Sequence, residues 1–260
     1  MDVIVDSTNP VHSASCILRA GLGFSGDAFL HPGEVPSVQV SPHHWRPSDD
    51  QFNETRIRDR AKLLGLALLN RKYVAPGWDD VYDMMIELAR QIKGIGYLPQ
   101  VIVGVSRGGW PPARIMSDLL ENANLANMKV EFYTNIGITA QRPKITQPVT
   151  SEVVGKRVLV VDDVADSGHS LRVTVKHLAR KGAREIRVCT LYVKPKSIFK
   201  PNHYARTTSK WVIFPWERLE AIHLIKRNLK SGGTTQAVIR ELKGSGLSPS
   251  LIRKLSALDR

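Results

Sequence analysis

Four short apolar runs, each followed by a polar loop, alternate with stretches of helical periodicity between residues 73 and 193. The runs are QVIVGV, KVEFYT, RVLVV and EIRVCTLYV. Strands that alternate with helices predict a parallel sheet with helices on both faces. In such a sheet, ligands bind beyond the carboxyl ends of the strands. The sequence therefore predicts an α/β fold whose binding site lies in the loops that follow the strands.

Three helices are expected, one before the first strand and two between strands. Asp79 is a candidate N-cap for the first, WDDVYDMMIELARQIK. Pro111 and Pro112 open the second, which runs to Leu120, because proline is tolerated in a first helical turn. The third covers residues 167–181, whereas the polar segment 135–150 is expected to be a loop. The residues expected to face the core are Val81, Met85, Leu88, Ile92, Leu171, Val175 and Leu178.

The loop after the third strand, DDVADSGHS, combines carboxylates with features that bind phosphate. Ser167 and Gly168 lead into a helix, so free backbone N–H groups and the positive end of the helix dipole converge on one place. Ser170 adds a hydroxyl donor. Asp162 and Asp163 end the strand, where they can contact sugar hydroxyls or a magnesium ion. The loop is suited to a phosphorylated sugar, and the chain contains neither GxxxxGK[ST] nor GxGxxG.

Two other interpretations fit this loop less well. Any parallel strand can end in two aspartates followed by a turn. The string VLVVDD also opens the receiver domains of response regulators, but a receiver carries that strand near its start. The later acceptor aspartate and signalling lysine of a receiver are not apparent at suitable positions, so both interpretations are disfavoured.

The string VLVVDDVADSGHS resembles the phosphoribosyl-pyrophosphate (PRPP) loop of type I phosphoribosyltransferases, and VGVSRGGWPPARI resembles their pyrophosphate loop. YVKP followed by KWVIFPWE resembles the base-binding hood of bacterial xanthine–guanine enzymes and their archaeal relatives. The resemblance covers roughly residues 73–217. Family members often have threonine where Ser167 and Ser170 stand, and the hydroxyls are retained. The resemblance implies the type I phosphoribosyltransferase fold, a twisted parallel sheet flanked by helices with a small C-terminal hood.

The resemblance also implies roles for the two loops. Asp162 and Asp163 would bind the ribose hydroxyls of PRPP and its Mg²⁺. Asp166 would be the catalytic acid that faces N7 of a purine and manages its proton, although it could instead cap the following helix. Arg107 would counter the charge of the departing pyrophosphate and so share in catalysis. The residues implied to hold the 5′-phosphate are Asp166, Ser167, Gly168, His169 and Ser170. Those implied to hold pyrophosphate are Ser106, Arg107, Gly108 and Gly109.

The hood residues indicate the base. Lys194 matches the lysine that donates to the 6-oxo group of a purine, Trp211 matches the aromatic that stacks on the base, and the Val212 backbone would read its edge. Trp216 is expected to be a core aromatic. Because adenine offers a donor at position 6, a cation there favours hypoxanthine, guanine or xanthine. The implied activity is Mg²⁺-dependent transfer of the phosphoribosyl group from PRPP to N9 of a 6-oxopurine, a purine-salvage reaction.

A second class of function remains open, a PRPP-sensing regulator that keeps the fold and binds nucleic acid. The formal charge of +13 suggests an anionic partner, phosphorylated or nucleic. Residues 218–260 are basic and faintly resemble a helix-turn-helix. A small helical cap with a solvated basic face is the favoured interpretation of this tail. We expect the chain to form a homo-oligomer.

Residues 1–72 show no sustained periodicity and are rich in proline, histidine, serine and glycine, which is typical of a poorly ordered extension or of mis-started sequence. A metal site at His43 and His44 is disfavoured because no other ligand stands at suitable spacing. No apolar run approaches the roughly 20 residues of a membrane helix. Cys189 lies in an apolar run as a buried residue, so a reducing, cytoplasmic setting is expected.

Overall fold

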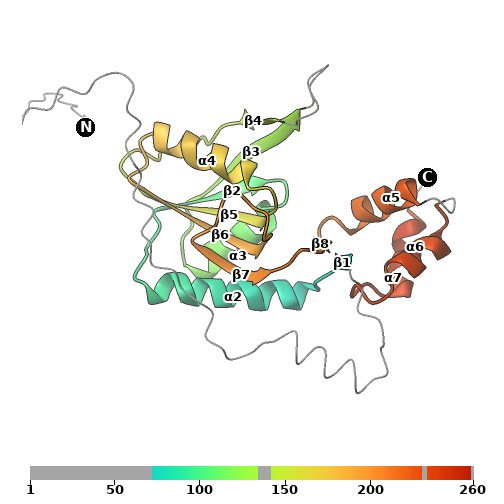
Figure 1. Cartoon of the computed structure of the whole chain (residues 1–260). Helices are drawn as coiled ribbons and strands as arrows, with labels where there is room; N and C mark the ends of the chain where they lie inside the picture. Colours follow the sequence, from blue (N-terminus) through green and yellow to red (C-terminus); the bar gives the residue numbers. More distant parts are fainter. Residues whose placement is uncertain (1–71, 134–141, 230–232, 259–260) are drawn as a thin grey trace, which may run out of the picture. The chain divides into compact units, whose positions relative to one another are not determined.

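The computed structural model describes residues 72–133, 142–229 and 233–258, and its centre is a six-stranded sheet of order β4-β3-β2-β5-β6-β7 (Figure 1). The strands are β2 (Val101–Ser106), β3 (Leu125–Tyr133), β4 (Arg142–Gln147), β5 (Arg157–Ala165), β6 (Glu185–Val193) and β7 (His203–Thr207). Every neighbouring pair is parallel except β3 with β4. The expected parallel sheet is confirmed, with one antiparallel edge.

Strand β4 corrects the sequence-based expectation of a loop over residues 135–150. Residues 142–147 pair with β3 in antiparallel register, Glu131 opposite Lys144 and Val130 opposite Ile145. Among the described side chains of β4, Ile145 alone packs against a buried core cluster. A strand at the sheet edge needs few apolar residues and tolerates proline, here Pro143, so its sequence looks like a loop.

Helices cover both faces of the sheet (Figure 1). The two helices α2 (Trp78–Gly94) and α3 (Trp110–Leu119) share a buried cluster with Leu159 and Val161 of β5. Helix α4 (His169–Arg180) shares another with the alternate β5 residues Val158 and Val160. Because successive side chains of a strand point to opposite faces, the apolar run of β5 serves both cores at once.

The predicted inner faces of the helices are buried, but the start of α2 differs from the prediction. Its N-cap is Gly77, whose N–H donates to the Asp80 carboxylate at 2.7 Å, and Asp79 does not cap it. Asp80 reaches the first unpaired N–H because it lies three residues after the cap. The predicted inward residues Val81, Met85, Leu88, Ile92, Leu171 and Leu178 are buried, and Val175 is half-buried against the same core as Leu171.

A second, two-stranded sheet pairs β1 (Tyr73–Val74) in parallel with β8 (Trp211–Val212). The chain then forms α5 (Arg218–Asn228), α6 (Thr235–Glu241) and α7 (Pro249–Ser256). Apolar residues of these three helices share a third buried cluster with Ala75 and Ile213, which flank the small sheet. The basic tail is therefore packed against the hood.

Most of the expectations for residues 1–72, including His43 and His44, lie outside the described residues. Lys72 is described, and its carbonyl accepts a hydrogen bond from the Trp211 N–H at 2.8 Å. Cys189 is fully buried, as the sequence predicts. Across the described ranges, no helix is both long enough and apolar enough to cross a membrane.

Candidate functional site

The SRGG segment joins β2 to α3 by a turn that packs on the end of β5. The Gly109 N–H donates to the Val105 carbonyl at 2.8 Å. A Cβ on Gly109 would lie 2.6 Å from the carbonyl oxygen of Val161 and 2.7 Å from that of Val105, so only glycine fits there. The Ser106 hydroxyl donates to the side-chain oxygen of Asn127 on β3. The peptide bond between Ser106 and Arg107 is cis.

The two loops singled out in the sequence meet at Gly108. A Cβ on Gly108 would lie 1.9 Å from Oδ2 of Asp163 and 2.6 Å from its Cγ. The predicted pyrophosphate loop and the predicted ribose carboxylates are therefore in contact. This follows from the strand order, because β2 and β5 are parallel neighbours and their carboxyl ends lie at the same edge of the sheet.

Asp162 and Asp163 are both buried at the end of β5. The Asp163 N–H donates to Asp162 Oδ1 at 3.0 Å, and the Val164 N–H donates to Asp163 Oδ1 at 2.7 Å. Burial raises the pKa of Asp162 well above its ordinary value, and the charge of Asp163 raises it further. Burial likewise raises the pKa of Asp163, against the lowering effect of the Val164 N–H. A cation or hydroxyl donors at this point would relieve the cost of the buried charge.

These two carboxylates suit a magnesium ion. Mg²⁺ is commonly held by one or two carboxylates together with oxygens of a phosphorylated substrate, rather than by an all-protein cage. No cluster of three or more potential metal-ligating His, Cys, Asp or Glu side chains occurs in the part of the chain that the structure describes. The two buried carboxylates fit a magnesium ion by their oxygen chemistry.

The loop between β5 and α4 is built around Gly168, which is the N-cap of α4 and has φ +82°. A Cβ on Gly168 would lie 2.6 Å from the Phe199 nitrogen and 2.7 Å from the Ser197 hydroxyl. The Ile198 N–H donates to the Ser167 carbonyl at 3.0 Å, and the His169 N–H approaches the Ser167 hydroxyl at 3.5 Å. Ser170 lies in the first turn of α4, which contains no acidic residue. The turn is thus suited to an anion.

Asp166 does not cap α4, because the N-cap is Gly168 and no side chain caps that helix. Its carboxylate is 58% exposed and lies 3.3 Å from the Lys196 ammonium. The alternative interpretation, in which Asp166 caps α4, is therefore wrong. Asp166 is instead a largely exposed carboxylate just beyond the end of β5, paired with Lys196.

Lys194 links the end of β5 to the residue that precedes β8. Its backbone N–H donates to the Ala165 carbonyl at 3.0 Å, and its side-chain ammonium donates to the Lys210 carbonyl. The residue is buried, and this burial lowers its pKa, whereas the nearby charge of Asp166 raises it. The ammonium carries three donors, and the Lys210 carbonyl is its acceptor among the described residues.

Trp211 lies on β8 with 37% of its surface exposed, and its ring centroid is 5.6 Å from that of Tyr73. The N–H groups of Trp211 and Ile213 donate to Lys72 and Val74 on the β1 side. Backbone groups of successive strand residues point to opposite edges, so those of Val212 point away from β1. The hood therefore presents the Trp211 ring beside the Val212 backbone edge that does not pair with β1.

Trp216 packs as the sequence suggested, as a core aromatic. It stacks on Phe214 with ring centroids 4.9 Å apart and an interplanar angle of 5°, and its centroid is 5.7 Å from that of Trp78. These contacts fix the chain just before α5.

The fold brings two further carboxylates to this site that no sequence motif marks. Glu220 of α5 forms an ion pair with Arg107. Glu217 accepts a hydrogen bond from the Phe214 N–H at 3.2 Å. Burial first, then the charges of Asp163 and Glu220, raise the pKa of Glu217 to about 7, although the Phe214 N–H and Arg107 lower it. No local pattern in the sequence tells which loop a tail helix will touch.

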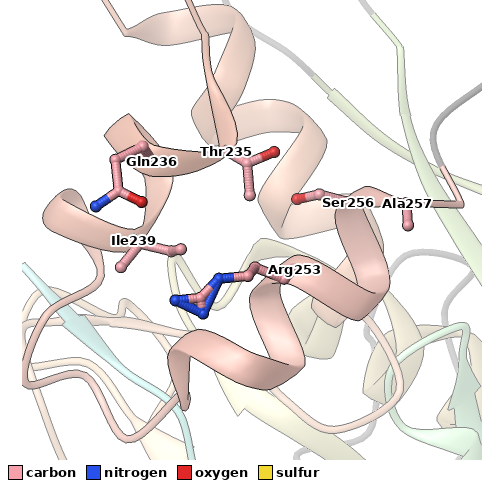
Figure 2. A pocket seen from close by; sticks show the side chains of 6 residues that line it. All are labelled: Thr235, Gln236, Ile239, Arg253, Ser256 and Ala257. Carbon is pink, nitrogen blue, oxygen red and sulfur yellow. The ribbon is translucent and has the colours of Figure 1, made fainter.

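A groove of about 430 Å³ lies elsewhere, between α6 and α7 (Figure 2). It is lined by Thr235, Gln236, Ile239, Arg253, Ser256 and Ala257. None of these is a predicted site residue, and the groove is separate from the loops that end β2 and β5.

Residues 77–218 match the family model described as the phosphoribosyl transferase domain. The chain is 32% identical to the xanthine-guanine phosphoribosyltransferase of Gluconobacter oxydans, over 56% of this chain and 84% of that protein. It is 36% identical to the crystal structure of a purine phosphoribosyltransferase from Pyrococcus horikoshii, with a TM-score of 0.52 over 56% of this chain and 93% of the other. A xanthine-guanine-hypoxanthine phosphoribosyltransferase from Helicobacter pylori, at 22% identity, shares the fold with a TM-score of 0.51 over 58% and 99%.

Proposed function

The chain belongs to the phosphoribosyl transferase domain family, and from that premise we propose that it transfers the 5-phosphoribosyl group of PRPP to N9 of a 6-oxopurine. In this reaction a bond forms between purine N9 and the anomeric carbon of the ribose. The bond from that carbon to the pyrophosphate oxygen breaks, and the purine proton leaves. The products are a nucleoside monophosphate and pyrophosphate.

One structural observation carries the proposal: the candidate residues form a single connected series. Gly108 contacts Asp163, β5 ends at Ala165, and Ala165 accepts a hydrogen bond from Lys194. The Lys194 side chain in turn donates to the carbonyl of Lys210, which directly precedes Trp211. The residues proposed to bind pyrophosphate, ribose, phosphate and base are therefore linked by a short series of contacts, which supports a common site for PRPP and a purine.

The phosphate groups would be held at the two glycine turns. Backbone N–H groups at the start of α4, with the Ser167 and Ser170 hydroxyls, suit the 5′-phosphate. The turn through Ser106 and Gly109 suits the pyrophosphate, with Arg107 offsetting its charge. Because the ribose carbon gains positive character as the leaving group departs, stabilising the pyrophosphate lowers the barrier most directly.

Asp162 and Asp163 would hold Mg²⁺ together with the ribose hydroxyls. The ion, when bound, would neutralise negative charge on the leaving pyrophosphate. The raised pKa values of the two carboxylates support this assignment, because a buried pair without a cation is costly to ionise.

Asp166 is proposed to accept or return the proton at purine N7, since it is exposed beside the phosphate turn and does not cap α4. The names of the similar proteins, which refer to xanthine, guanine and hypoxanthine, agree with Lys194 as a donor to a 6-oxo group. The aromatic face of Trp211 would stack on the base, and the Val212 backbone would contact its edge.

A radiolabelled-base assay with PRPP and Mg²⁺ across adenine, guanine, hypoxanthine, xanthine and uracil tests the proposal. Product from one or more 6-oxopurines, and none from adenine or uracil, is expected. Turnover of adenine alone would overturn the role of Lys194. Absence of turnover with every base, combined with PRPP binding, would favour the alternative, a PRPP-sensing regulator. A regulator would have no need of Asp166, Lys194 and Trp211 together, so the enzyme is preferred.

A further inference from the structure

Arg107, the candidate pyrophosphate ligand, is held by a residue from outside the family domain. Its Nη2 lies 2.9 Å from Oε1 and 2.6 Å from Oε2 of Glu220. The match to the family model ends at residue 218, two residues before Glu220. The contact therefore joins the centre of the proposed active site to the C-terminal helices of this chain.

Glu220 lies on helix α5, which packs against the hood. Its neighbours Ala221 and Ile222 are buried in the cluster shared with Ala75 and Ile213 of the hood. The Arg218 guanidinium, two residues earlier, donates to the Pro76 carbonyl at 2.8 Å. With α5 anchored on both sides of Glu220, its carboxylate is aimed at Arg107 by the fold.

Two other acidic residues, Asp163 and Glu217, lie near Arg107 and Glu220. The charges of Asp163 and Glu220 raise the pKa of Glu217, and the charge of Arg107 lowers it, so these groups lie near one another. Arg107 pairs directly with Glu220 in this group. Its charge is already engaged before any ligand arrives.

We propose that Glu220 competes with the pyrophosphate group of PRPP for Arg107 and so sets the affinity of the pyrophosphate subsite. The inference rests on the proposed function, since it assumes that pyrophosphate binds at the SRGG turn. A carboxylate and a phosphate both bind a guanidinium through paired oxygens, and the Arg107 nitrogen that contacts Glu220 cannot serve both fully. Binding of the ligand releases Glu220, and its return helps pyrophosphate to leave.

The expected size of the effect follows from exposure. The Arg107 and Glu220 side chains are 76% and 63% exposed, and an exposed ion pair is worth a modest free energy that salt screens. Loss of the competitor should therefore tighten pyrophosphate binding by about two- to five-fold at low ionic strength. The gain should shrink as salt is added.

The test is calorimetric titration of the full chain with inorganic pyrophosphate in the presence of Mg²⁺, comparing wild type, Glu220→Gln and Glu241→Gln. Glu241 is the matched control, because this tail carboxylate pairs with Lys72 and not with Arg107. Tighter binding by Glu220→Gln alone supports the proposal. Unchanged or weaker binding overturns it, and weaker binding would make Glu220 a residue that orients Arg107 productively.

A second pair of variants separates competition from simple loss of negative charge. In an Arg107→Gln background, Glu220→Gln should no longer change the affinity for pyrophosphate. If it still does, Glu220 acts through general repulsion and the proposal fails. If wild type binds neither pyrophosphate nor PRPP, the proposed function fails first, and the inference falls with it.

Discussion

The Asp163 carboxylate occupies the space that any side chain on Gly108 would need, with 1.9 Å between Oδ2 and an added Cβ. Gly108→Ala should therefore push Asp163 away from its position at the end of β5. A displacement of about 1 Å in a catalytic group can cost on the order of 100-fold in rate, so kcat/KM for PRPP should fall by about that factor. Steady-state kinetics measures the fall.

Gly94→Ala is the matched control, because a Cβ there would have no atom within 4 Å. It should leave kinetics unchanged. Equal activity of the Gly108→Ala and Gly94→Ala enzymes would mean that Asp163 can move without consequence, which would remove it from the proposed site.

Asp166→Asn should lower kcat by about 10²- to 10⁴-fold while the affinity for PRPP stays nearly unchanged, because the change removes a proton acceptor and keeps the shape. Single-turnover kinetics and a separate PRPP titration distinguish the two effects. Lys196→Met, which removes the 3.3 Å ion pair with Asp166 but keeps the carboxylate, should be far milder. Unchanged turnover in Asp166→Asn would refute its assignment as the acid.

Lys194→Met should reduce kcat/KM for hypoxanthine and guanine by about ten- to hundred-fold, the range for losing a hydrogen bond from a charged donor. Methionine keeps most of the buried volume, so folding should be less affected than by alanine; circular dichroism can check this. PRPP affinity should change little. Parallel losses for base and PRPP would make Lys194 structural or a phosphate ligand.

Glu217 should make stability depend on pH. Its pKa of about 7 in the folded chain exceeds the ordinary value of 4.5, so the folded state binds more protons between these values. The free energy of unfolding contributed by Glu217 should therefore fall as pH rises from about 4.5 to 7 and stay lowered above that range. Glu217→Gln should flatten this decline, measured as urea midpoints from pH 5 to 8.

The Asp162 and Asp163 pair also has raised pKa values, so part of the pH dependence should persist in Glu217→Gln. Glu121→Gln, at a carboxylate 87% exposed in its pair with Lys93, serves as control and should follow wild type. A Glu217→Gln profile that also follows wild type would mean that this carboxyl keeps its ordinary pKa.

The basic tail allows a test of the nucleic-acid alternative. Arg253 and Lys254 of α7 are exposed and form no ion pair within the described ranges. If the tail binds DNA, Arg253→Glu with Lys254→Glu should abolish a salt-dependent gel shift and spare catalysis. These substitutions are preferable to deleting residues 218–260, which would uncover Ala75 and Ile213 of the hood. Absence of a shift by wild type at low salt would leave a helical cap.

The strands that position the site could be predicted because each central strand is buried on both faces. A fully apolar run such as VLVV has few other solutions in a soluble protein, and the polar residues that follow it mark the binding edge. Strand β4 was not predicted for the opposite reason. Among its described side chains Ile145 alone packs inward, and an edge strand contains few apolar residues. The roles assigned to the individual site residues remain predictions.

The contacts of α5 could not be predicted from sequence. Glu217 and Glu220 lie in a string, PWERLEAI, that resembles an ordinary helix start with acids in the first turn. Their partners Phe214 and Arg107 are set by how the tail packs on the hood. Likewise, the sequence alone does not show whether Asp79 or Asp80 accepts a hydrogen bond at the start of α2. The backbone at Gly77 decides this, because its N–H donates to Asp80.

The parallel pairing of β1 with β8 has a consequence for synthesis on the ribosome. Tyr73 emerges early, but its partner Trp211 emerges only after β2 to β7 have been made. Domains can begin to fold as the chain leaves the ribosome, so the sheet and the turns proposed to bind phosphate can form while Tyr73 still lacks its partner. The Trp211 face that is proposed to stack on a base is completed later than these turns, and Glu217 and Glu220 follow it. A nascent chain arrested before β8 should therefore bind pyrophosphate in a titration and show no affinity for purine.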